Sequence, residues 1–131
     1  MSLYQKFCIE KIDERGCLKE FSLQYPENFN FAYDVVDVIA ETEPERKALV
    51  WCNTENTEHV FTFSEVRAYS NQIANVLRKH GIGRGDRVML VLKRHYRFWF
   101  AILGLHKLGA IAVPATNQLQ DHDFSYRFNA A

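Results

Sequence analysis

The sequence has few cysteines, no net charge and no long apolar run, and each absence argues against a class of protein. Its three cysteines are odd in number and show no C-x-x-C spacing, which argues against a disulfide framework and a zinc cluster; they are Cys8, Cys17 and Cys52. Basic and acidic residues are equal, at 16 of each, so the charge gives no reason to expect nucleic acid or an anionic membrane as a partner.

No stretch approaches the roughly 20 uncharged apolar residues that a membrane-spanning helix needs. The longest candidate, residues 98–105, is short and follows basic residues directly. The first residues contain no long apolar run, so no secretory signal is expected. Free thiols are typical of a reducing compartment. These features predict a cytoplasmic protein without a membrane span.

The 131 residues have the size and composition of one globular domain, with 47% hydrophobic and 24% charged residues. An aromatic content of 14% argues against disorder. No internal repeat or low-complexity tract is visible. Residues 1–28 are polar and mixed, and we expect them to form an N-terminal extension of short helical pieces that Gly16 interrupts.

A helix and a hairpin are predicted next. Apolar residues recur at helical spacing over residues 30–43, with Asn30 as a candidate cap and Pro44 where the helix should have ended. Residues 47–52 and 60–63 read as strands joined by a polar turn.

The T-x-x-E pattern from Thr62 to Glu65 predicts a capping box, in which each residue bonds the backbone of the other. The helix that it opens is expected to run to about His80. Gly81 then suits the position after the last turn, where a positive φ costs a glycine little.

The remaining elements predict an α/β fold. Residues 88–92 and 110–113 read as buried strands of a partly parallel sheet, and a helix is expected between them over residues 96–108. Asp121 is a candidate cap for a last helix over residues 122–128. This βαβα order has no strand after the last helix, so the sheet is expected to be incomplete and the chain truncated inside a continuing element.

Residues 81–86, GIGRGD, are the one glycine-rich stretch. A phosphate-binding loop follows a strand and opens a helix, whereas here a helix ends and a strand begins. We therefore interpret the stretch as a helix end and a turn. The RGD tripeptide at residues 84–86 matches the integrin-binding sequence, but the turn is the favoured interpretation in a chain without a secretory signal.

Residues 93–95, KRH, form a basic cluster at the end of a predicted strand. Ligands of open α/β sheets bind outside the carboxyl ends of strands, so an anion contact is one interpretation, and a solvated turn is the other. A run of aromatic residues follows and suggests stacking on a ring, but consecutive positions point around a helix, which favours packing. The run consists of Tyr96, Phe98, Trp99 and Phe100.

No other residues form a recognisable reactive group. The histidines show no metal-ligand spacing; they are His59, His80, His95, His106 and His122. The carboxylates around Pro44 are interpreted as a solvated helix end; they are Glu41, Glu43 and Glu45. The residues alone therefore assign no catalytic, cofactor-binding or metal-binding position.

Five strings, taken in order and spacing, are similar to the opening of the adenylate-forming superfamily, which includes acyl-CoA synthetases, luciferases and nonribosomal peptide adenylation domains. The strings PENFNFAYD and VPATNQL most resemble the medium-chain acyl-CoA synthetase branch. The resemblance implies that residues 29–131 are the N-terminal portion of an AMP-binding domain. The strings occupy residues 26–34, 61–66, 81–88, 107–110 and 113–119.

This resemblance implies a reaction in which ATP and a carboxylic acid form an acyl-adenylate that coenzyme A then attacks, with magnesium stabilising the phosphate charge. The family's Ser/Thr/Gly-rich loop ending in Lys does not occur in these 131 residues. The isolated chain is therefore expected to be inactive, with the rest of a synthetase as its partner and self-association through uncovered apolar surface. The alternative is a non-catalytic module, such as a truncated paralogue that pairs with a full-length synthetase.

Overall fold

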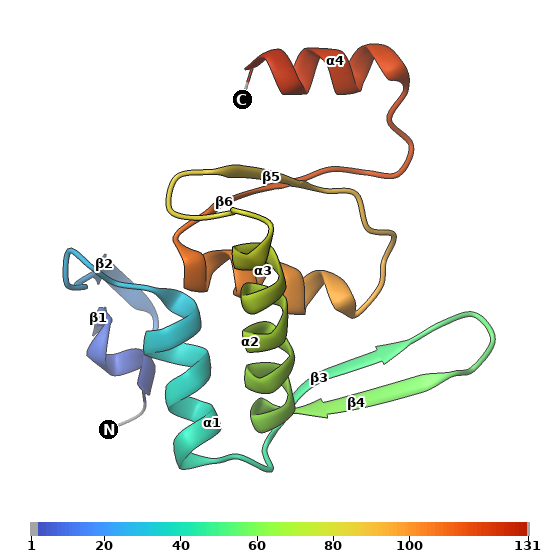
Figure 1. Ribbon diagram of the computed structural model, residues 1–131. Coiled ribbons are helices and arrows are strands. Elements are labelled where there is room, and N and C mark those ends of the chain that lie inside the picture. Colours follow the sequence, from blue (N-terminus) through green and yellow to red (C-terminus); the bar gives the residue numbers. More distant parts are fainter. Residues whose placement is uncertain (1–2, 131) are drawn as a thin grey trace.

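The computed structural model describes residues 3–130 as three packed helical segments flanked by three two-stranded sheets (Figure 1). This mixed α/β arrangement confirms the predicted fold class. In chain order the elements are η1 (Leu3–Lys6), β1 (Cys8–Ile12), β2 (Leu18–Leu23), η2 (Ala32–Asp37), α1 (Val38–Thr42), β3 (Lys47–Cys52), β4 (Glu58–Thr62), α2 (Phe63–Lys79), β5 (Arg87–Leu90), α3 (Arg97–Leu108), β6 (Ile111–Pro114) and α4 (Asp121–Ala130).

The N-terminal extension is an antiparallel hairpin of β1 and β2, which corrects the prediction of short helical pieces. Only η1 is helical among the described residues before Asn30. The turn forms because the Asp13 carboxylate accepts hydrogen bonds from the backbone N–H groups of Arg15 and Cys17, at 2.9 and 2.8 Å. Gly16 adopts a φ of +79° within this turn, so it reverses the chain rather than interrupting a helix.

The helix predicted from Asn30 is present, but its first part is wound as a π-helix, η2, that continues into α1. The Asn30 side chain accepts a hydrogen bond from the Ala32 N–H at 3.0 Å, and the Asp34 carboxylate accepts one from the Asn30 N–H at 2.6 Å. Asn30 therefore caps this helix as predicted. Ala32, Val36 and Ala40 are buried at intervals of four residues and face the other helices.

The hairpin of β3 and β4 and the capping box both follow the prediction. The strands pair antiparallel, and the second begins slightly earlier than expected, at Glu58. At the start of α2, the Glu65 carboxylate accepts from the Thr62 N–H at 2.9 Å, and the Thr62 hydroxyl accepts from the Glu65 N–H at 3.3 Å. Gly81 follows the helix with a φ of +84°, as expected.

The β5–α3–β6–α4 order also matches the prediction, and β5 pairs parallel with β6. The two strands are only half-buried, however, which corrects the expectation of fully buried strands. Helix α3 packs beside the pair, while α4 stands apart from it, and none of the described α4 residues is buried (Figure 1). Asp121 is the first residue of α4 rather than its cap; the Asp123 carboxylate instead accepts from the Gln120 N–H at 3.0 Å.

The core lies where α2, α3 and the helix from Asn30 meet. Leu105 is completely buried there, and Gly104 lets α3 approach α2 closely. A Cβ atom on Gly104 would lie 2.9 Å from the Ile73 methyl group and 3.1 Å from the Ser70 carbonyl oxygen. Within residues 3–130, no helix has both the length and the apolar character needed to cross a membrane.

Candidate functional site

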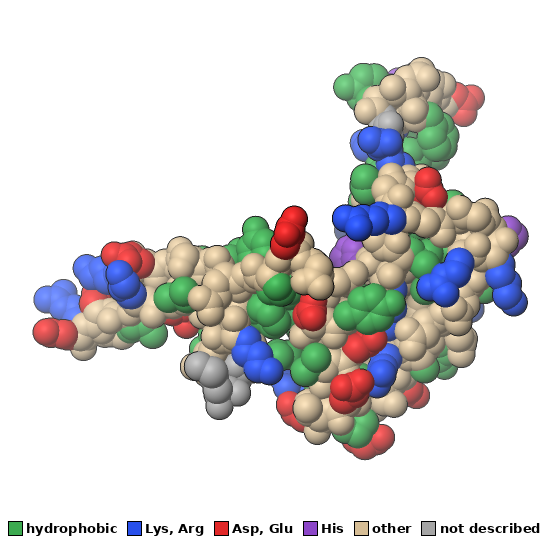
Figure 2. All heavy atoms as spheres, turned by 60° about the vertical axis from the view of Figure 1, so that its left-hand side comes forward, with side chains coloured by type: hydrophobic (Ala, Val, Ile, Leu, Met, Phe, Trp, Pro, Cys, Tyr) green, Lys and Arg blue, Asp and Glu red, His purple; other side chains and the backbone are tan. Residues whose placement is uncertain are grey.

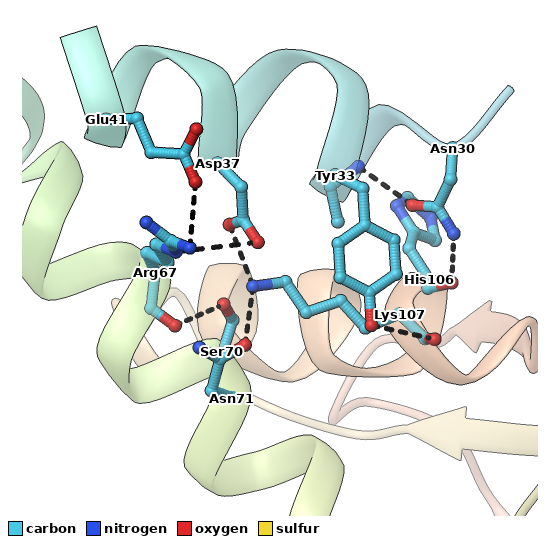
Figure 3. A network of polar contacts seen from close by, with 10 residues as sticks. Asn30, Tyr33, Asp37, Glu41, Arg67, Ser70, Asn71, His106 and Lys107 are labelled. Atoms are coloured by element: carbon cyan, nitrogen blue, oxygen red, sulfur yellow. Dashed lines mark hydrogen bonds and ion pairs between the residues drawn. The ribbon is translucent and has the colours of Figure 1, made fainter.

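A buried ion pair anchors the C-terminal end of α3 to the other helices (Figure 3). The Lys107 ammonium donates to the Asp37 carboxylate at 2.8 Å and to the Asn71 side-chain oxygen at 2.7 Å. Only 1% of the Lys107 side chain is exposed. Arg67 lies 3.8 Å from the same Asp37 carboxylate and 3.0 Å from Glu41. This network joins η2, α1, α2 and α3 through charges that are paired with one another.

The last carbonyl groups of α3 are also bonded by side chains from the helix that starts after Asn30. The Asn30 amide donates to the His106 carbonyl at 2.7 Å, and the Tyr33 hydroxyl donates to the Lys107 carbonyl at 3.4 Å (Figure 3). The His106 carbonyl also accepts from the Gly109 N–H at 2.9 Å, so Asn30 adds a second bond to this helix end, while Tyr33 bonds one of the carbonyls that a helix end leaves open. Asn30 thus caps its own helix and binds the end of another.

His106 lies beside this network, and burial lowers the pKa of its imidazole from the usual 6.5. Its Nδ1 atom is buried without a hydrogen-bond partner among the described residues. Because the charged form is disfavoured by loss of solvent, neutral His106 fits this position. The ammonium of Lys107 is likewise sequestered. We therefore interpret the network as a structural anchor that positions α3, not as a reactive centre.

The basic residues 93–95 lie at the other end of α3, beside the β3–β4 hairpin. Trp51 of β3 donates its indole N–H to the Arg94 carbonyl at 2.7 Å. The Trp51 ring lies 5.3 Å from the His95 ring and 5.4 Å from the Tyr96 ring. His95 in turn accepts from the Arg97 N–H at 3.2 Å through Nδ1, near the start of α3. Sequence reasoning found the basic residues but missed Trp51, which is distant in the chain.

We call the ring assembly at this end the aromatic–histidine cluster. His59, on the strand next to Trp51, lies 5.0 Å from the Tyr96 ring, and Phe61 lies 4.9 Å from it. Phe100 continues the assembly at 5.1 Å from Phe61. The members are Trp51, His59, Phe61, Tyr69, His95, Tyr96 and Phe100.

The predicted aromatic run divides between two sides of α3, as expected for consecutive positions on a helix. Tyr96 and Phe100 join the aromatic–histidine cluster. Phe98 and Trp99 contact each other at 5.4 Å elsewhere on α3, and Trp99 is about half-exposed. Part of the run therefore packs, and part remains on the surface.

Two hollows flank the aromatic–histidine cluster. One, of about 540 Å³, lies over Tyr69, Gln72 and Arg97; the other, of about 360 Å³, is bordered by Lys93 and Trp99. Both combine ring faces with cationic side chains, and the second is lined by residues that follow β5. Aromatic faces and cations favour a ligand that is planar or anionic. This region is the candidate functional site of the chain.

The glycine-rich stretch at residues 81–86 is a turn, as predicted. The Gly83 N–H donates to the Asp86 carboxylate at 2.7 Å, and the Gly85 N–H donates to the Gly109 carbonyl at 2.9 Å. These amides are therefore occupied and do not point at a ligand. Arg84 of the RGD tripeptide packs against Gly109, since a Cβ there would lie 3.3 Å from the Arg84 side chain.

The remaining candidates are dispersed. Glu41 pairs with Arg67 and Glu43 with Arg46, while Glu45 is exposed. His80 ends α2, and the exposed His122 lies in α4, 3.3 Å from Asp123. Within the described part of the chain, no three His, Cys, Asp or Glu side chains gather as a metal site. The three cysteines are free thiols; they are Cys8, Cys17 and Cys52.

The fold is a mixed α/β arrangement, and the chain belongs to the AMP-binding enzyme family, whose model matches residues 36–131. Among curated relatives, it is 39% identical over 112 residues to acyl-coenzyme A synthetase ACSM5 of Rattus norvegicus, covering 81% of this chain and 19% of the relative. It is 41% identical over 110 residues to human ACSM2A, and the match covers 79% of this chain and 19% of ACSM2A. The chain thus spans about a fifth of these relatives and confirms the resemblance to medium-chain acyl-CoA synthetases.

Solved structures support the same assignment. The fatty acid AMP ligase of Legionella pneumophila matches with a TM-score of 0.68 and 29% identity, over 76% of this chain and 18% of that one. A fatty acyl CoA synthetase of Mycobacterium tuberculosis matches with a TM-score of 0.66 and 29% identity, over 76% of this chain and 19% of the synthetase. The arrangement of the described elements is therefore that of the N-terminal domain of adenylate-forming enzymes.

The cytoplasmic location predicted from the sequence is wrong in the light of these relatives. The curated synthetases of rat and human are named as mitochondrial proteins. Net charge, free thiols and the lack of a long apolar run do not separate a mitochondrial from a cytoplasmic protein, because neither class needs a membrane span or disulfides.

Proposed function

We propose that this chain supplies the N-terminal part of the AMP-binding domain of a mitochondrial acyl-CoA synthetase. Such an enzyme joins a carboxylic acid to coenzyme A and converts ATP to AMP and pyrophosphate. The observation that carries the proposal is the family match over residues 36–131 together with the 39% identity to ACSM5. The aromatic–histidine cluster includes His95 and Tyr96, which lie between the end of β5 and the start of α3.

ATP and coenzyme A are reactants in this proposal and magnesium is the implied metal, but the turn at residues 81–86 does not fit a phosphate site and the described residues do not fit a metal site. The amides of the turn at residues 81–86 are bonded within the protein, and the described acidic side chains do not converge on one point. No step of the reaction is therefore assigned to a residue of this chain. Its contribution is positioning: the helices carry the sheet end against which other parts of a synthetase pack.

A chimera tests this function. The aligned segment of rat ACSM5 is replaced by residues of this chain, and acyl-CoA formation from octanoate is measured. We expect activity in the chimera, because the shared fold should place α3 and the sheet as in the relative. A control chimera carrying Lys107→Met should lose thermal stability and activity together. A folded chimera with the melting temperature of ACSM5 and no activity would argue against the proposal.

The 131-residue polypeptide by itself is proposed to be inactive in acyl-adenylate formation. Pyrophosphate release is measured with octanoate, ATP and magnesium, with full-length rat ACSM5 as the positive control. The expected result is release by the control and none by the polypeptide above the rate without protein. Measurable release that depends on octanoate would overturn this part of the proposal.

The uncovered apolar surface favours a second candidate, a non-catalytic module that associates with another chain. Leu92 and Ile111 are exposed beside β5 and β6, and Tyr126 and Phe128 are exposed on α4, which forms the projection at the top of Figure 2. We expect the polypeptide to self-associate or to bind a full-length synthetase through this surface. Sedimentation measures self-association, and co-purification with ACSM5 measures binding to a full-length synthetase. A monodisperse monomer that does not co-purify with ACSM5 would contradict both expectations.

A further inference from the structure

An apolar groove separates the N-terminal hairpin from the helix that starts after Asn30. We call it the N-terminal groove; its volume is about 450 Å³, within the range of about 300–1,000 Å³ usual for ligand pockets. Residues of η1 and the hairpin line one side, and residues of η2 and α1 line the other. The side chains that define it are Phe7, Cys8, Phe29, Val35, Ile39 and Arg46.

Packed rings and backbone bonds hold the open shape of the N-terminal groove. Phe7 meets Phe29 edge-on at 5.0 Å, and Tyr25 lies 6.0 Å from Phe29. The Phe7 carbonyl accepts from the Gln24 N–H at 2.9 Å, which closes the base of the hairpin. Because these contacts join the hairpin to the segment before the helix, the groove exists before any ligand binds.

One end of the N-terminal groove is cationic. It adjoins a smaller hollow of about 370 Å³ that shares Ile39 and Arg46 with it and is also lined by Lys6 and Glu43. Glu43 pairs with Arg46 at 3.3 Å, and both side chains are more than half exposed. No ion pair of the Lys6 ammonium is found among residues 3–130. Two cations against one carboxylate leave a net positive charge at this end.

We propose that the N-terminal groove binds a linear medium-chain carboxylate, with the alkyl chain between Phe7, Val35 and Ile39. The carboxylate lies at the cationic end, where Lys6 and Arg46 donate charge-assisted hydrogen bonds. The groove shares no residue with the aromatic–histidine cluster. The inference does not rest on the proposed function, since binding requires neither ATP nor coenzyme A.

Cys8 provides a direct test, because it lines the groove while Cys17 and Cys52 are exposed elsewhere. The 131-residue protein is alkylated with N-ethylmaleimide at several decanoate concentrations below micelle formation, and each cysteine is followed by peptide mass spectrometry. Protection follows 1 + [L]/Kd, so a concentration about four times Kd should slow Cys8 alkylation by about fivefold. Cys17 and Cys52 are internal controls and should react at unchanged rates.

Variants identify the two ends of the site. Val35→Trp fills the apolar part and should abolish protection of Cys8. If that variant fails to fold, Lys6→Ala with Arg46→Ala remains informative: it removes two charge-assisted hydrogen bonds and should weaken decanoate binding by about a hundredfold. Lys11→Ala, an exposed charge on the same hairpin, is the matched control and should bind as the parent does.

Four results would contradict the proposal. One is the absence of protection at Cys8, and another is equal protection of all three cysteines, which indicates a general surfactant effect. The third is protection that rises with protein concentration without decanoate, which would show that a second copy of the chain occupies the groove. Decanol should protect more weakly than decanoate, and equal protection would contradict the role of the cationic end.

Discussion

The helices around Lys107 and the hairpin of β1 and β2 each contain a lysine–carboxylate pair, in opposite surroundings. The Lys107–Asp37 pair is almost completely buried and has Asn71 as a further partner. The Lys11–Glu20 pair leaves about two-thirds of each side chain exposed. The hairpin forms the arm on the left of Figure 2, and charged side chains gather at the outer end of this arm. Buried charges must be paired for the helices to pack, whereas exposed charges are solvated by water and gain little from a partner.

Apolar side chains are also buried among the central helices and exposed in the flanking elements. Leu105 and Phe100 are enclosed where the helices meet, and Gly104 removes the side chain that would keep α2 and α3 apart. Every described residue of β2 is exposed, and no described residue of α4 is buried. Stability should therefore depend strongly on the central helices and weakly on the flanks, and single substitutions can test this difference.

The largest effect is expected for Lys107→Met. It leaves Asp37 buried without its main partner, which should lower the free energy of unfolding by about 3–5 kcal/mol. Denaturant titration followed by circular dichroism measures the loss. Lys11→Met is the matched change in the hairpin and should cost less than about 1 kcal/mol.

A double variant isolates the cause of the Lys107 effect. Asp37→Leu together with Lys107→Met removes both charges and should recover much of the stability lost in the single variant, because no unpaired charge stays buried. Equal losses for Lys107→Met and Lys11→Met would remove the distinction between the two regions.

The second effect is expected for Gly104→Ala. The added methyl group would lie 2.9 Å from the Ile73 methyl group and 3.2 Å from the Ala74 backbone nitrogen, so α2 and α3 must separate. We expect a loss of about 1–3 kcal/mol, typical of overpacking. Gly83→Ala meets only the Asp86 carboxylate at 4.0 Å and should stay within about 0.5 kcal/mol of the parent. An unchanged unfolding midpoint in the Gly104 variant would show that α2 and α3 accommodate the added methyl group without a loss of stability.

The third effect concerns the start of α2. Thr62→Ala removes the hydroxyl that accepts from the Glu65 N–H and should cost about 1 kcal/mol. Thr54→Ala, in the exposed β3–β4 turn, controls for the loss of a threonine side chain and should be close to neutral. The unfolding midpoints of the two variants are compared directly; a larger loss at Thr54 would contradict the capping role.

The smallest effect is a pH dependence from His106. Its pKa is lowered by burial, so between the folded pKa and 6.5 the unfolded chain binds more protons than the folded one. Stability from this group is complete above pH 6.5 and falls as the pH drops toward the folded pKa. His106→Gln should reduce this slope, which thermal unfolding between pH 5 and pH 8 measures. A slope that is unchanged in the variant would place the charged imidazole in solvent.

Local signals predicted two helix caps and the turn after α2. The pattern from Thr62 to Glu65, the glycine after α2 and the asparagine before η2 each act within a few residues of chain, so their outcome depends little on the rest of the fold. The N-terminal hairpin was missed because its strands show no regular alternation of apolar and polar residues, and its turn depends on one side chain, that of Asp13.

Only part of the candidate site could be predicted. The basic residues before Tyr96 follow a predicted strand, so their place at the sheet end was accessible from the sequence. Trp51 and His59 come from a separate hairpin, and nothing local indicates that they would meet Tyr96. The half-burial of β5 was also unpredictable, since the same apolar string suits a strand covered on one face or on both.

The sequence by itself determined the caps at Asn30 and Thr62, the turn after α2, the βα order and the family resemblance, because these depend on neighbouring residues or on an ordered set of strings. Tertiary structure alone decided that Lys107 pairs with Asp37 across 70 residues and that Asn30 bonds the end of α3. It also brought the rings of Trp51 and His95 together. The physical reason is that such contacts depend on how helices and hairpins pack, and no short-range pattern encodes which distant partners will meet.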